Sequence, residues 1–164
     1  MSRYTEVSHR QWIAAPADVV RAQFADLQHH ISADVHPKLR FEVLAQQACS
    51  ARFVQEVRLL GMRQRDVFER RIELDGTMID RSVEGFNRGG SLTFHFQPQS
   101  VDGQAGTWVE ITVRLPLPPL VGRLLRPLLE AQIRKELAAA SLQDKADIEQ
   151  RGYPRQVGLH AAAA

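Results

Sequence analysis

Apolar residues recur every three or four positions along residues 120–151, the last long segment of the chain. On an α-helix of about 3.6 residues per turn, this spacing places them in one broad stripe. The stripe consists of Leu120, Val121, Leu124, Leu125, Leu128, Leu129, Ile133, Leu137, Ser141 and Ile148. Because such a stripe can cover a sheet, we predict a long helix packed on a sheet, which Pro127 breaks or restarts early. The residues predicted to make this contact include Leu124, Leu128, Ile133 and Leu137.

An acidic residue, Asp144, lies inside the same stripe, at about 20° and about 40° from two of its apolar members on a helical wheel. The neighbouring charges Lys145, Asp147 and Glu149 fall to either side. Asp144 is therefore predicted to be the one acid of this segment that faces inward, and a buried carboxylate needs a partner. Two interpretations stay open. In the first, the apolar stripe becomes irregular near the C-terminal end of the helix, and Asp144 is half exposed or bonded to a nearby arginine. In the second, Asp144 points into an internal cavity and binds a cation, a histidine or a polar ligand group.

Short segments that alternate between apolar and polar residues occupy residues 39–117, separated by turn residues such as Asp75-Gly76. This pattern is typical of an antiparallel meander. The predicted strands are residues 39–48, 52–60, 65–74, 78–84, 91–97 and 109–115. Residues 4–14 are predicted to form a further strand, ahead of the meander in the chain.

A short helical region is predicted between the first strand and the meander. Ala15-Pro16-Ala17-Asp18 is a typical helix start, with proline in the first turn. The helical region should end by about Val35, because His36 precedes Pro37 and proline disfavours the helical conformation of the residue before it.

The length of 164 residues suits one domain, which we place at residues 1–152, with a loose tail at residues 153–164. With 44% hydrophobic and 24% charged residues, the chain is expected to be a globular protein without a signal peptide or transmembrane segment. A single cysteine, Cys49, cannot form an intramolecular disulfide, so a reducing, cytoplasmic location is expected.

The basic residues are scattered along the presumed strands, and the formal net charge is only +2. The densest basic group comprises Arg63, Arg65, Arg70 and Arg71. Acidic residues interleave with it, as expected for cross-strand ion pairs on a solvated sheet face. Nucleic acid is therefore not an expected partner.

The order of elements, together with the segment Ile13-Ala14-Ala15-Pro16-Ala17-Asp18-Val19-Val20, resembles the START-like superfamily, also called SRPBCC or Bet v 1-like, and its polyketide cyclase-type members. The resemblance implies an α+β helix-grip fold. In this fold a curved antiparallel sheet of about seven strands grips a long C-terminal helix, and two short helices follow the first strand. It also implies an internal hydrophobic cavity for a lipid, polyketide, hormone or aromatic ligand, which we expect to measure about 300 Å³ or more.

A narrower resemblance, to the catalytic domain of Rieske-type oxygenases, lies in residues 26–36. Asp26 and His29 match the beginning of that family's iron-binding helix, but Asp34 stands where its second histidine is expected. Gln143-Asp144 is similar to the family's third, acidic ligand position. One cysteine cannot supply the ligands of a Rieske cluster.

What the narrower resemblance implies is a divalent metal, Fe or Zn, held by two histidines and one carboxylate. The candidate ligands are His29, His30, His36 and Asp144, with His36 and one of His29 or His30 expected near the Asp144 carboxylate. Two alternatives stay open: the histidines are structural and bond to Asp26 and Asp34, or they act as an acid or base without metal.

Three functions are compatible with these observations. The first is a binding module or cyclase-like protein whose cavity holds a hydrophobic or aromatic small molecule, oriented by His30, His36, Asp144 and Arg81. The second is a mononuclear non-haem metal enzyme that acts on an aromatic substrate. The third is a START-like interaction or chaperone protein. No oligomeric state is predicted.

Overall fold

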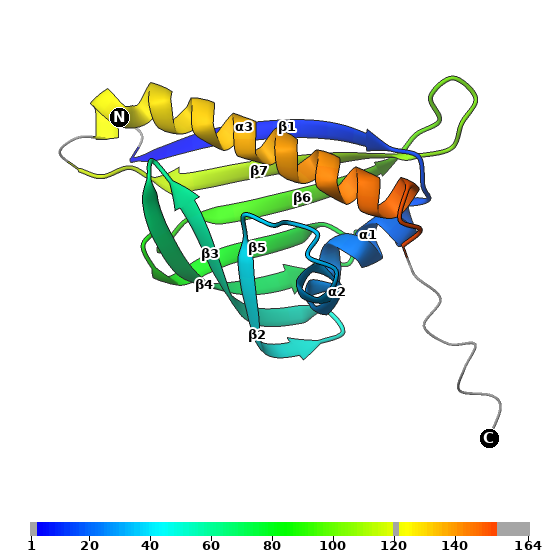
Figure 1. The fold of residues 1–164 in the computed structure, drawn as a ribbon, viewed down its shortest axis with the longest axis horizontal. Helices are drawn as coiled ribbons and strands as arrows, with labels where there is room; N and C mark the ends of the chain where they lie inside the picture. Colours follow the sequence, from blue (N-terminus) through cyan, green and yellow to red (C-terminus); the bar gives the residue numbers. More distant parts are fainter. Residues whose placement is uncertain (1–2, 120–121, 154–164) are drawn as a thin grey trace.

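A seven-stranded antiparallel sheet curves around one long helix in the computed structural model, which describes residues 3–119 and 122–153 (Figure 1). The elements in chain order are β1 (Tyr4–Ile13), α1 (Ala17–Ala25), α2 (Leu27–Ser32), β2 (Arg40–Gln47), β3 (Ser50–Leu59), β4 (Met62–Ile72), β5 (Met78–Gly85), β6 (Ser91–Pro98), β7 (Thr107–Pro116) and α3 (Gly122–Glu149). This is the predicted α+β helix-grip architecture, with two short helices after the first strand.

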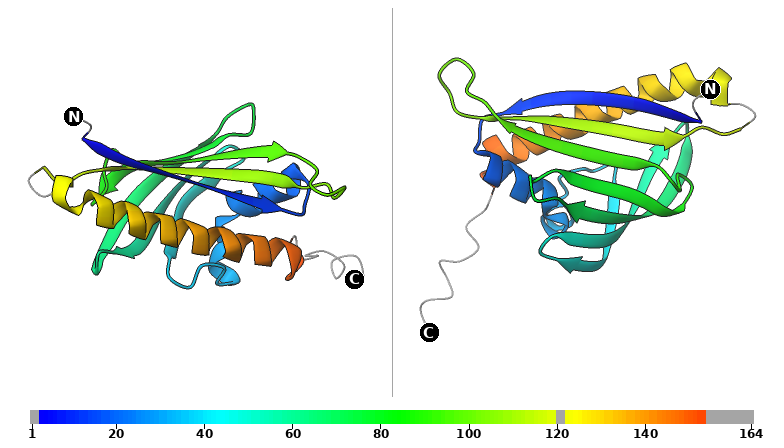
Figure 2. Two further views of the ribbon diagram at one scale, coloured as in Figure 1. Left: turned by 90° about the horizontal axis from the view of Figure 1, so that it is seen from above. Right: turned by 180° about the vertical axis from the view of Figure 1, so that it is seen from behind.

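The strand order is β1-β7-β6-β5-β4-β3-β2, so the strands from β2 to β7 form a meander. β1 joins it by pairing with β7, from Tyr4 opposite Pro116 to Ile13 opposite Thr107. Figure 2 shows α3 lying across one face of the sheet, with α1 and α2 near the C-terminal end of α3. The two short helices and α3 thus enclose the concave face of the sheet.

The buried face of α3 is narrower than predicted. Leu129, Ile133 and Leu137 are buried against the sheet, as expected, but Leu124 and Leu128 are 83% and 59% exposed. Neighbouring residues of a helix point in directions about 100° apart, so Leu128 points away from the sheet although the next residue, Leu129, points toward it. Pro127 does not interrupt α3, which runs without a break from Gly122 to Glu149. Pro127 is the sixth residue of α3 and is exposed, so its missing N–H removes one hydrogen bond in the second turn without ending the helix.

A second buried acid on α3 contradicts the expectation that Asp144 alone faces inward. Asp144 and Asp147 are 3% and 0% exposed. Asp147 follows the buried Leu129 by 18 residues, which is about five whole turns, so both project from the same side of the helix.

Tyr153, the first residue of the predicted loose tail, instead packs against the core. Its hydroxyl donates a hydrogen bond to Asp26 Oδ2 at 3.2 Å, and burial together with that carboxylate raises the pKa of Tyr153 to about 12. The remainder of the predicted tail, residues 154–164, lies outside the described residues. No helix among the described residues is long and apolar enough to cross a membrane.

Candidate functional site

A cavity of about 180 Å³ lies between the concave face of the sheet and α3. It is smaller than the 300 Å³ expected from the sequence. Its apolar wall includes Phe24, Leu27, Phe41, Phe68, Leu92, Phe94, Ile111, Val113, Ile133 and Leu137. The side chains of α3 and of the aromatic residues fill part of the space that the curved sheet encloses, which explains the modest volume.

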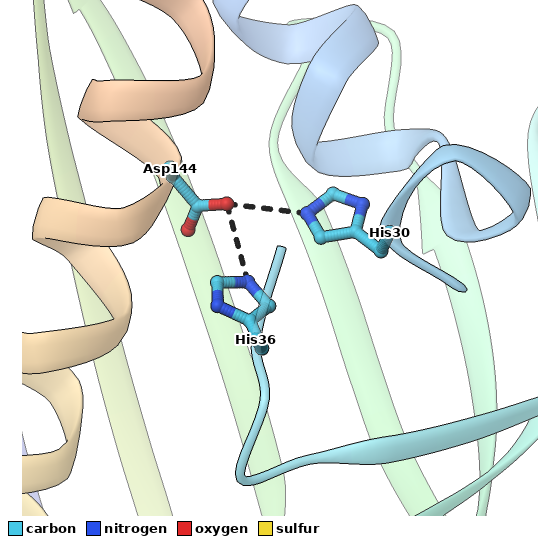
Figure 3. Close-up of side chains that lie close together, drawn as sticks. All are labelled: His30, His36 and Asp144. Atoms are coloured by element: carbon cyan, nitrogen blue, oxygen red, sulfur yellow. Dashed lines mark hydrogen bonds and ion pairs between the residues drawn. The ribbon is translucent and has the colours of Figure 1, made fainter. Parts of the chain in front are cut away.

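His30, His36 and Asp144 form a polar cluster on the wall of this cavity (Figure 3). Asp144 Oδ1 lies 3.2 Å from His30 Nε2 and 3.2 Å from His36 Nε2. The two imidazole rings stack with their centroids 5.1 Å apart, and all three residues are buried. The structure thus brings together three of the residues that the sequence singled out.

The local sequence explains how His30 and His36 meet. Asp26 caps α2 by accepting a hydrogen bond from the His29 backbone N–H at 2.9 Å, which fixes where the helix begins. α2 ends at Ser32, and Asp34 has a left-handed φ of 47° that reverses the chain. His36 therefore returns to a position beside His30, as expected if the helix unwinds ahead of Pro37.

In each histidine of the cluster, the Nδ1 atom lies at hydrogen-bonding distance from a carbonyl oxygen. His30 Nδ1 lies 2.7 Å from the Asp26 backbone oxygen, and His36 Nδ1 lies 2.9 Å from Gln143 Oε1. A carbonyl oxygen only accepts hydrogen bonds, so Nδ1 carries a hydrogen in both rings. The Nε2 atoms of both rings therefore point toward the Asp144 carboxylate.

His29 was a candidate for the same cluster, but it pairs with a different acid. Its Nε2 atom lies 2.7 Å from Asp147 Oδ2. The buried Gln23 links the two acids, since its amide nitrogen donates to Asp144 Oδ1 at 3.0 Å and to Asp147 Oδ2 at 3.2 Å. Sequence reasoning missed both Gln23 and Asp147, although the 18-residue separation from Leu129 marks Asp147 as inward-facing.

A buried arginine also lines the cavity, and it is Arg70 rather than the predicted Arg81. Arg70 Nε and Nη2 each donate to one carboxylate oxygen of Asp80, both at 2.7 Å, and Nη1 donates to the Phe24 backbone oxygen at 3.1 Å. Arg70 therefore does not belong to a solvated sheet face. Arg81 follows Asp80 on β5, so it projects from the opposite face of the strand and is exposed.

Strand alternation could have identified Arg70 from the sequence. Residues 64, 66, 68 and 70 of β4 point to the same side, and Phe68 requires that side to be buried. Asp66 on this side accepts hydrogen bonds from the backbone N–H of Asn87 at 2.6 Å and its side-chain amide at 2.8 Å. These contacts fix the turn between β5 and β6 at the cavity wall.

The charges of His36 and Asp144 stabilise each other. Burial opposes the charge of His36, but the Asp144 carboxylate and the hydrogen bonds of His36 to Asp144 and Gln143 outweigh burial and raise its pKa. Burial also opposes the charge of Asp144, yet His36 and His30 together hold its pKa well below the usual range. The metal-free cluster is therefore best paired where His36 is protonated and Asp144 is ionised.

This pairing predicts a pH-dependent stability in the presence of a metal chelator. The raised pKa of His36 adds stability that is complete below its unfolded value of 6.5 and is lost as the pH rises through the folded pKa. The lowered pKa of Asp144 adds stability that is present above its unfolded value of 3.8 and is lost on acidification. We expect urea unfolding to give a larger free energy at about pH 5 than at about pH 9. His36→Gln should reduce this difference, and an equal difference in both proteins would contradict the assignment.

The cluster also has the composition of a metal site. One atom each from His30, His36 and Asp144 lies within 4.8 Å of the others. Two imidazole nitrogens and one carboxylate oxygen suit zinc or iron.

Comparison with known proteins shows which fold the chain has. No protein-family model and no curated protein matches it. Among solved structures, a protein from Thermus thermophilus is similar with a TM-score of 0.71 and 22% identity, over 87% of this chain and 98% of that one. The Zhui aromatase/cyclase from Streptomyces sp. R1128 is similar with a TM-score of 0.66 and 19% identity, over 91% and 98%. A START superfamily protein from Mycobacterium smegmatis is similar with a TM-score of 0.68 and 15% identity, over 87% and 97%. The chain therefore has the helix-grip fold of the START-like proteins, as its sequence predicts.

Proposed function

We propose that the protein binds a small aromatic molecule in the cavity between the sheet and α3, with an oxygen atom of that molecule facing the His30–His36–Asp144 cluster. The observation that carries this proposal is an apolar cavity with a buried polar cluster on one wall. Ligand sites in proteins commonly combine apolar walls with a few polar groups that fix orientation.

The size of the cavity limits the ligand. A dry protein cavity of about 150 Å³ holds benzene, so a cavity of about 180 Å³ suits a small aromatic molecule. Phe24, Phe41, Phe68 and Phe94 supply aromatic surface around it. Edge-to-face and offset contacts with these rings favour a flat aromatic ligand over an aliphatic chain of equal volume.

The polar wall favours a ligand with a phenolic or carbonyl oxygen. A protonated His36 beside such an oxygen stabilises negative charge on it, which is what a cyclase-like reaction through an enolate requires. The Zhui protein, named an aromatase/cyclase, shares the fold and supports this reading. Whether the bound molecule reacts or is only carried, the same cavity and the same polar wall would hold it.

Naphthol tests the proposal, because it is a fluorescent two-ring phenol. We expect saturable binding to the protein in the presence of a metal chelator. Ala140→Phe should weaken this binding about tenfold or more, since Ala140 lines the cavity and a phenyl group would occupy it.

The matched control is Ala131→Phe, which makes the same change on the exposed face of the same helix. This variant should bind naphthol like the unaltered protein. Equal affinity in both variants, or no saturable binding to the unaltered protein, would overturn the proposal.

A further inference from the structure

We propose that His30, His36 and Asp144 bind one divalent transition-metal ion on the cavity wall, through the Nε2 atoms of both histidines and the carboxylate of Asp144. The proposal rests on the geometry of the three side chains and their neighbours (Figure 3). It does not depend on ligand binding in the cavity.

The first support is the hydrogen bonding behind the two histidines. Metal-binding histidines typically donate their other ring N–H to a carbonyl or carboxylate oxygen, which fixes the tautomer and the ring orientation. His30 makes this bond to the Asp26 backbone oxygen, and His36 makes it to Gln143 Oε1. Both rings therefore present Nε2, the atom that a metal would bind, toward the same point.

The second support is the spacing of the candidate ligand atoms. Two atoms bound to zinc at about 2.0 to 2.1 Å, at an angle between a right angle and the tetrahedral value, lie about 2.8 to 3.4 Å apart. Each histidine Nε2 lies 3.2 Å from Asp144 Oδ1. Both of these separations therefore match those of atoms bound to one ion, and all three ligand atoms lie within 4.8 Å of one another.

The third support is electrostatic. With hydrogen on Nδ1, a neutral histidine directs the lone pair of Nε2 at the negatively charged Asp144 oxygen, which is repulsive. A metal ion between these atoms places positive charge against all of them and removes the repulsion. The residues are 7%, 8% and 3% exposed in the order His30, His36 and Asp144, so water screens the repulsion little.

Three protein ligands leave at least one coordination position open, as in catalytic rather than structural zinc sites. All three side chains line the cavity, so that position is within reach of a molecule bound there. The class of ligand that completes such a site is an oxygen donor, for example water or a phenolate.

Cobalt(II) and zinc(II) test the proposal directly on the full-length protein, after removal of bound metal with a chelator and exchange into chelator-free buffer. We expect one cobalt ion per chain, with visible absorption bands typical of a coordination number of four or five. Zinc should displace cobalt and raise the melting temperature, because it binds the folded state. Unaltered melting at saturating zinc, together with no stoichiometric cobalt uptake, would overturn the proposal.

Variants identify the ligands. Asp144→Asn and His36→Gln should each weaken cobalt binding about a hundredfold or more, and circular dichroism should verify that each variant folds. His29→Gln should keep the affinity within about threefold, since His29 contacts Asp147, and exposed His95→Gln is the surface control. Unchanged binding in a folded Asp144→Asn or His36→Gln variant would place the metal elsewhere and overturn the assignment. Naphthol binding is measured separately, in the presence of a chelator, so the proposed metal site and the proposed ligand cavity are tested independently of each other.

Discussion

Asp80→Asn is expected to lower the free energy of unfolding by about 3 to 5 kcal/mol, because it leaves the Arg70 guanidinium buried without its counter-ion. Asp80 and Arg70 are 3% and 6% exposed, and the two carboxylate oxygens of Asp80 each accept a hydrogen bond from Arg70. Asparagine keeps the size of the side chain but removes its charge and presents an amide donor to the arginine. Urea unfolding followed by circular dichroism measures the effect.

Two comparisons separate this effect from a general sensitivity to charge removal. Glu84→Gln removes one partner of the partly exposed Arg52, and surface pairs of this kind are worth about 0 to 1 kcal/mol. The double change Arg70→Met with Asp80→Leu removes the buried pair entirely and should recover most of the lost stability. If Asp80→Asn cost no more than Glu84→Gln, the pair would not be the buried anchor that its geometry indicates.

Leu129→Ala is expected to cost about 2 to 5 kcal/mol, while Leu128→Ala changes the free energy of unfolding by no more than about 0.5 kcal/mol. The two leucines are neighbours on α3, but Leu129 is 7% exposed and Leu128 is 59% exposed. Both substitutions change helix propensity equally, so the difference between them reports the packing of α3 on the sheet. Chemical unfolding of both variants checks it, and similar costs would mean that α3 is rotated relative to the described structure.

The fold could be predicted because the local signals agree with one another. Strand alternation, turn dipeptides such as Asp75-Gly76 and the period of the last helix all favour the same architecture. The error in the buried face of α3 has a simple origin. A helix on a sheet buries one arc, and periodicity alone accepts Leu128 as readily as Leu129, because it does not say where that arc ends.

The meeting of Asp144 with His30 and His36 was predictable in outline, but the choice between His29 and His30 was not. These histidines are adjacent, and their directions depend on where α2 begins. Asp26 fixes that point through its cap, and the position of α2 against α3 then assigns one histidine to each acid. Arg70 was wrongly predicted to lie on the solvated face of the sheet for a different reason. A charged residue in an alternating strand is normally taken to mark the solvent side.

Asp26 uses three different atoms for three different contacts. Oδ1 caps α2, Oδ2 accepts the hydroxyl of Tyr153, and the backbone oxygen accepts from His30 Nδ1. Tyr153, just beyond α3, and the imidazole of His30 are therefore hydrogen-bonded to the same residue. Loss of the Tyr153 hydrogen bond would therefore free one oxygen of the same residue that caps α2 and orients the His30 ring on the cavity wall.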